Sequence, residues 1–130
     1  RSIGELVGAL HGAHDYGLLL YPFPRELAVG RAHLRTALAS KLFTYVAAGL
    51  PVLVSPELAY MAELVERHGI GLVVEERDHD RLRERLDVVD YPALQRAVRA
   101  AQSEFHIERF VPALVELLTA CGPVAAEVPP

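Results

Sequence analysis

Three short apolar runs, each separated from the next by a helical pattern, constrain the fold of this chain more than any other feature. They are "GLLLY" (Gly17 to Tyr21), "PVLVS" (Pro51 to Ser55) and "IGLVV" (Ile70 to Val74). Continuous apolar runs of this length are typical of strands that are buried on both faces of a parallel sheet. The sequence therefore predicts an α/β fold, a Rossmann-like parallel sheet with helices on both faces.

Helical spacing and capping residues predict the elements between and after these strands. Ser2 and Glu5 have the spacing of a capping box at the start of a helix that runs from Ile3 to about His11. A second helix is predicted from Lys41 to about Ala48, with Ser40 as its N-cap. The remaining predicted helices cover Pro56 to about His68, with Ser55 as the N-cap, and residues 78–86, 91–103 and 107–120.

The length of the chain and the number of strands suggest part of a larger domain. A chain of 130 residues fits one domain. Three strands make a thin sheet, because doubly wound folds usually carry about five or six. We expect residues 1–120 to form the second half of such a domain and residues 121–130 to form a tail. The chain opens at Arg1 and not at Met, which we interpret as an excised fragment whose upstream domain and targeting information lie elsewhere.

Composition argues against several classes of function. The net charge is −4 and no run of Lys or Arg occurs, so we expect no nucleic-acid partner. The one cysteine, Cys121, excludes a disulfide framework, and no two histidines have the i, i+4 spacing of a metal site. No apolar run approaches the roughly 20 residues of a membrane span. We expect a cytoplasmic protein without metal or cofactor, and peripheral association with a membrane is left open.

The start of the Lys41 helix is the first candidate for a binding site. Ligands of open α/β sheets bind beyond the carboxyl ends of the strands, where this helix is expected to begin. A helix N-terminus attracts phosphate, and Lys41 has the wrong sign for the helix dipole unless an anion binds beside it. Thr44 lies on the same side and could reach a neighbouring hydroxyl group. An ordinary capped helix with solvated side chains is the alternative.

The long segment between the first strand and this helix is the second candidate. Residues 22–39 lack clear periodicity and are predicted to form a loop, and loops of this length are often functional. His33 and Arg35 lie in this segment and could contact a phosphate or a sugar. The alternative is that both are solvated loop residues.

Two stretches, "SKLFTYVAAGLPVLVS" and "AELVERHGIGLVV", resemble the donor-side domain of GT-B glycosyltransferases. The similarity is to the group 1, family 4-like retaining enzymes, which transfer sugars from nucleotide diphosphates, and it spans about residues 3 to 118. The matching positions are Lys41, Phe43, Tyr45, Ala47, Ala48, Gly49, Pro51, Val52, Glu63, Leu64, Val65, Gly69, Gly71 and Val73.

The resemblance also implies roles for individual positions. The family carries two glutamates eight positions apart, of which the second binds the donor ribose and falls on Thr44. The first meets the donor sugar and falls near Thr36, and the Pro-Asn pair before the lysine is Ala39-Ser40 here. A carboxylate can accept two hydroxyl hydrogen bonds at once, and a threonine cannot replace that geometry.

Two functions follow from these observations. In the first, the chain is a glycosyltransferase fragment that binds a nucleotide-diphosphate sugar for transfer to an unidentified acceptor, together with an N-terminal domain of the same protein. Lys41 and the helix N-terminus would stabilise the leaving pyrophosphate, and no catalytic residue is identified. In the second, the chain is a non-catalytic GT-B-like binding or assembly module that has lost the acidic pair.

Overall fold

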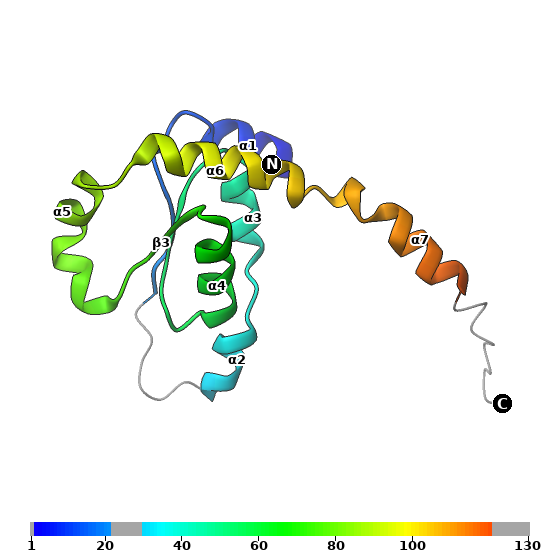
Figure 1. Cartoon of the computed structure of the whole chain (residues 1–130), viewed down its shortest axis with the longest axis horizontal. Coiled ribbons are helices and arrows are strands. Elements are labelled where there is room, and N and C mark those ends of the chain that lie inside the picture. The colour runs from blue at the N-terminus through cyan, green and yellow to red at the C-terminus, as the bar shows by residue number, and fades with distance from the viewer. Residues whose placement is uncertain (1, 22–29, 121–130) are drawn as a thin grey trace.

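The fold is a three-stranded parallel sheet with helices around it, as the sequence predicts (Figure 1). The computed structural model describes residues 2–21 and 30–120. Strands β1 (Gly17–Leu19), β2 (Val52–Val54) and β3 (Gly71–Val73) lie in the order β1-β2-β3, with both pairings parallel. Each strand is shorter than the apolar run that predicted it: β1 covers the first three residues of its run, and β2 and β3 cover the central three of theirs.

The register of the sheet places matching residue types side by side. Leu19, Val54 and Val73 form one row across the three strands. Leu18, Leu53 and Leu72 form the adjacent row, whose side chains point to the opposite face because strand residues alternate. The first row packs into the main hydrophobic core, whereas Leu18 is 53% exposed. The main hydrophobic cluster therefore lies against the first row, and on the other face the central residue Leu53 is buried as well, with 1% exposed.

Helices α3 (Ser40–Ala47) and α4 (Ala59–His68) connect the parallel strands and cover this core. Leu42 and Val46 of α3 pack there with Met61 and Val65 of α4. The C-cap of α4 is Gly69, whose φ of 62° suits a glycine. Helices α3 and α4 thus form one layer against the sheet.

The start of α4 corrects one prediction. Ser55 was expected to be the N-cap, but the helix begins at Ala59 with Leu58 as its N-cap residue. The carbonyl oxygen of Ser55 instead accepts a hydrogen bond from the Leu58 amide at 3.1 Å, in a turn that precedes the helix. The side chain of Ser55 is free for another role, described below.

The first helix, α1 (Ile3–Leu10), confirms the predicted capping box. The Glu5 amide donates to Ser2 Oγ at 3.2 Å, and the Ser2 amide donates to Glu5 Oε2 at 2.8 Å. These reciprocal bonds satisfy two backbone donors that the helix leaves unpaired.

The chain after β3 is helical, as expected. Asp90 is the N-cap of helix α6 (Tyr91–Glu104), and its carboxylate accepts from the Ala93 amide at 2.9 Å. Val98 and Ala101 of α6 pack in the core. Helix α7 (Val111–Ala120) projects away from the rest of the fold (Figure 1). The other elements are η1 (Glu76–Arg81), α5 (Leu82–Asp87) and η2 (Ile107–Arg109).

Helix α2 (Gly30–Thr36) lies within the segment that was predicted to be a loop, so that prediction is wrong over these residues. The helix is held by Leu34, which is 9% exposed and belongs to the hydrophobic core. Helix α2 packs against α4. Residues 22–29 of the expected loop and the expected tail, residues 121–130, lie outside the described residues.

Candidate functional site

The candidate site is the carboxyl edge of the sheet, where one buried serine joins two strands. Ser55 follows β2, is 3% exposed, and is the buried polar residue of the described part of the chain. Its amide donates to the Leu19 carbonyl at 3.2 Å, and its Oγ accepts from the Tyr21 amide at 3.2 Å. Ser55 therefore holds the chain that leaves β1 beside the chain that leaves β2. Sequence reasoning missed this role because a serine before a proline resembles an N-cap.

Helix α3 begins at this edge, since it runs back antiparallel to the strands that it connects. Its N-cap is Ala39, and no side chain caps it, so the prediction that Ser40 is the N-cap is wrong. The Ala39 amide donates to Met61 Sδ at 3.3 Å, which anchors the start of α3 against α4. Among the residues that the structure describes, no side chain bonds the first-turn amides, so the end of α3 retains its capacity to bind an anion.

Ser40 and Lys41 lie on the first turn of α3, and Thr44 lies one turn further along. Ser40 and Lys41 are exposed, and Lys41 forms no ion pair with any residue that the structure describes. The Thr44 hydroxyl donates to the Ser40 carbonyl at 3.2 Å, so its oxygen lone pairs remain available as acceptors. This end of α3 therefore offers one cation, backbone donors and a hydroxyl acceptor.

The other predicted residues lie on the neighbouring helix. His33, Arg35 and Thr36 are exposed on α2, and the Thr36 hydroxyl donates to the His33 carbonyl at 3.4 Å. Only residues 37–39 separate α2 from α3, so both groups lie at the same end of the sheet. Within the described residues, no hydrogen bond or ion pair joins the two groups. The signal for α2 was weak, because the helix has only seven residues and Leu34 is the one buried side chain among those whose burial is described.

A polar hollow of 410 Å³ lies at the opposite, amino edge of the sheet. His11 Nδ1 lies 3.0 Å from the Ala48 carbonyl oxygen there, and the Tyr91 hydroxyl donates to the Asp15 carbonyl at 2.9 Å. The rings of Tyr16 and Tyr91 meet edge to face with their centroids 5.3 Å apart. Burial is the main cause that raises the pKa of both tyrosines, and the Asp15 carboxylate adds to it. These polar contacts hold α1 and α6 to the sheet, so we explain the polar side chains of this hollow by their structural role and not by a ligand.

The described residues also limit the chemistry. In residues 2–21 and 30–120, no group of three or more His, Cys, Asp or Glu side chains is placed to hold a metal ion. No helix of that part is both long enough and apolar enough to span a membrane.

Comparison with known proteins agrees with this architecture. Residues 4–116 match the family described as "Glucosyltransferase 3-like, C-terminal domain". Neither the curated proteins nor the solved structures compared with the chain gave a significant match. The family match covers most of the chain, including the sheet and the residues at its carboxyl edge. This chain therefore belongs to the glucosyltransferase 3-like C-terminal domain family.

Proposed function

We propose that this domain binds the nucleotide-diphosphate sugar donor of a GT-B glycosyltransferase similar to the group 1, family 4-like retaining enzymes. One observation carries the proposal: helix α3 begins without a side-chain cap at the carboxyl edge of the sheet, next to a lysine that pairs with no described residue. Membership of a glucosyltransferase-like family supports the same class of reaction.

The pyrophosphate is the part of the donor that this helix end suits. Free amides at a helix N-terminus carry a partial positive charge and point outward, toward the position of an anion. Lys41 adds a full positive charge within the same turn. As the bond between the sugar and the diphosphate breaks, negative charge grows on the leaving oxygen. The amides and Lys41 would stabilise that charge and lower the barrier.

Thr44 is one turn further along α3 and suits a hydroxyl of the ribose. Its own hydroxyl hydrogen is directed to the Ser40 carbonyl, so it can accept one hydrogen bond from the ligand. Ser40, on the first turn, can contribute its hydroxyl to the phosphate. His33, Arg35 and Thr36 would approach the donor sugar or the phosphates from α2.

Transfer of the sugar would also need a site for the acceptor, which the described residues do not supply. The acceptor would be bound by an N-terminal domain of the same protein, and the transfer would take place in the cytoplasm. We assign no catalytic residue, and the mechanism that we propose for this domain is limited to binding the donor and stabilising its leaving group.

A non-catalytic binding or assembly module is the second candidate. The observation that favours it is the hydrogen bond from Thr44 to Ser40, because a hydroxyl held in this way cannot make the two contacts to ribose that a carboxylate makes. Thr36 is also held, by the His33 carbonyl. In this case the fold would be kept while the donor site was lost.

Titration with nucleotides separates the two candidates. UDP, GDP, TDP and their sugar conjugates are added to the chain, with heat and amide NMR shifts as readouts, and the matching nucleosides without phosphate serve as controls. We expect one nucleotide diphosphate to bind and to shift the amides of Ser40 and Lys41. Binding of none of these ligands would favour the non-catalytic module.

A further inference from the structure

Two side chains from other helices bond the last turn of α3. Gln102 of α6 donates through Nε2 to the Val46 carbonyl at 2.9 Å and to the Ala47 carbonyl at 3.1 Å. His11, the C-cap of α1, lies with Nδ1 3.0 Å from the Ala48 carbonyl oxygen. Because a carbonyl only accepts, His11 Nδ1 carries the hydrogen of this bond. Helices α6 and α1 therefore bond consecutive carbonyls at the same end of α3.

The backbone bonds the carbonyls that come just before. The Gly49 amide donates to the Val46 carbonyl and the Leu50 amide to the Tyr45 carbonyl, both at 2.9 Å. This is the pairing of a Schellman motif, and the φ of 78° at Gly49 suits it. These backbone bonds do not reach the last two carbonyls, which the side chains from α6 and α1 bond instead. The C-terminal end of α3 is thus held firmly, whereas among the described residues no side chain caps its N-terminal end.

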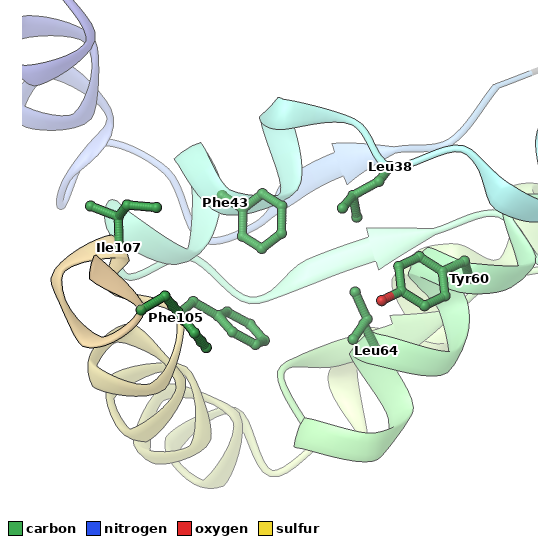
Figure 2. Close-up of a pocket in the computed structure, with 7 residues that line it drawn as sticks. Leu38, Phe43, Tyr60, Leu64, Phe105 and Ile107 are labelled. Carbon is green, nitrogen blue, oxygen red and sulfur yellow. The ribbon is translucent and has the colours of Figure 1, made fainter. Parts of the chain in front are cut away.

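Helix α6 also contacts α3 through an aromatic pair (Figure 2). Phe105, the C-cap of α6, meets Phe43 of α3 edge to face with the ring centroids 5.6 Å apart. Phe105 follows Gln102 by three residues, and side chains with this spacing lie on one face of a helix. One face of α6 therefore makes both a polar and an aromatic contact with α3.

We propose that Gln102 and His11 are positioning residues for donor binding, because their bonds to the last turn of α3 set where its first turn lies. The inference rests on the proposed function, since the first turn carries the amides and Lys41 that would bind the pyrophosphate. The eight residues of α3 span about 12 Å, so a displacement of one end along the axis moves the other end equally. Neither side chain touches the nucleotide, because both bond the opposite end of the helix.

Hydrogen bonds define the position of α3 along its axis more sharply than its apolar packing does. Leu42 and Val46 are buried in the core, but the hydrophobic effect has no direction. Hydrogen bonds weaken steeply as their angle departs from the preferred range. The bonds from Gln102 and His11 therefore favour one axial position of the helix.

Loss of these bonds should lower the fraction of molecules in which the first turn of α3 is in place. The apparent Kd of a ligand rises in inverse proportion to the fraction that can bind it. Gln102→Met keeps the length of the side chain and removes its donors. We expect this variant to raise the Kd of the nucleotide diphosphate that binds the wild type, among UDP, GDP and TDP, by roughly threefold to tenfold.

Gln95→Met is the matched control, because it makes the same change on the same helix. Gln95 forms a hydrogen bond with Tyr91 of α6, and none of the hydrogen bonds described joins it to α3. The control should leave the Kd within about twofold of the wild type. Equal effects of the two methionine variants would overturn the proposal.

His11 is tested by a variant that keeps its donor. The side-chain amide of an asparagine can donate from near the position of His11 Nδ1, so His11→Asn should keep the Kd within about twofold of the wild type. His11→Leu has no donor and should raise the Kd in the same direction as Gln102→Met. If the asparagine and leucine variants raise the Kd equally, the bond to Ala48 does not position α3.

The nuclear Overhauser effect between the Ala39 amide hydrogen and the Met61 methyl group measures the position of α3 without any nucleotide. The Ala39 amide lies 3.3 Å from Met61 Sδ, at the end of α3 that is remote from Gln102. We expect Gln102→Met to weaken this effect and Gln95→Met to leave it unchanged, while circular dichroism shows that both variants keep their helical content. An unchanged effect in Gln102→Met would overturn the proposal, even where urea unfolds the variant more easily, because Gln102 would then only stabilise the fold.

This measurement also separates the inference from the proposed function. A wild type that binds none of UDP, GDP and TDP would contradict the donor site, and the nuclear Overhauser effect would still decide whether Gln102 positions α3. Where the wild type binds one of them, a raised Kd together with a weakened effect in Gln102→Met supports the proposal. An unchanged Kd in that variant overturns it.

Discussion

The ring of Tyr45 lies directly against the backbone of Gly17, so closely that a Cβ added to the glycine would be 2.2 Å from Tyr45 Cγ. Tyr45 belongs to α3 and Gly17 to β1, and this contact lets the helix approach the strand. A glycine in a strand often marks such a close approach. The position of α3, and so of its N-terminus at the candidate site, depends on this pair.

Gly17→Ala should therefore lower the free energy of unfolding by about 1–3 kcal/mol, because an overpacked contact must displace the Tyr45 ring at its root. Urea unfolding measures the change. Gly8→Ala is the control, since Gly8 lies in α1 and a Cβ added there would meet no atom within 4 Å. That variant should gain roughly 0.5–1 kcal/mol through helix propensity. Equal losses in both variants would contradict the close approach.

Lys41→Ala should weaken the binding of a nucleotide diphosphate by roughly 1.5–3 kcal/mol, the range for a hydrogen bond to a charged group. Calorimetric titration gives the affinity, and the difference between variant and wild type should shrink at high salt. Arg96→Ala removes one exposed positive charge from α6 and serves as the matched control. If Arg96→Ala weakens binding as much as Lys41→Ala, the effect is one of net charge and not of the helix end.

Thr44→Glu should strengthen nucleotide binding by on the order of 1 kcal/mol, because a carboxylate can accept from both ribose hydroxyls but must first shed water. The test compares wild type and variant in the same titration. A 2′,3′-dideoxy nucleotide removes both partners and should abolish the gain. Weaker binding by the variant would show that the pocket around Thr44 is built for a different ligand group.

The fold should lose stability in alkaline solution. The pKa of Tyr16 is raised by burial, by Tyr91 and by Asp15, so the folded state keeps a proton that the unfolded chain has already released. The contribution of Tyr16 to the free energy of unfolding is complete below the pKa of the unfolded chain, about 10. It is lost as the pH rises through the higher pKa of the folded state. Urea unfolding at a series of alkaline pH values measures this decline.

Tyr91→Phe should make that decline shallower, because it removes one raised pKa and one cause of the raised pKa of Tyr16. At neutral pH the variant loses the hydrogen bond that the Tyr91 hydroxyl donates to the Asp15 carbonyl, and its stability falls accordingly. Tyr60→Phe, at an exposed position on α4, is the control. An unchanged pH dependence in Tyr91→Phe would show that the two tyrosines do not titrate together.

Local patterns in the sequence determined the elements of this fold and their order. The three apolar runs became the three parallel strands, and the spacing of Ser2 and Glu5 became a capping box. The sequence also predicted a helix that carries Lys41 on its first turn and Thr44 one turn further along. These features depend on residues that are close together in the chain. The periodicity of apolar side chains and the spacing of capping residues can therefore be read from the sequence.

Only the tertiary structure decided the features that depend on contacts between distant segments. Helix α2 forms because Leu34 is buried in the core next to α4, and its own pattern is too short to predict it. The start of α3 lies at Ser40 because the Ala39 amide is bound by Met61 Sδ. Ser55 accepts from Tyr21 and does not cap a helix. In each case the partner is distant in the chain, 22 residues away for Ala39 and 34 for Ser55. Burial against such a partner outweighs the local preference on which sequence reasoning depends.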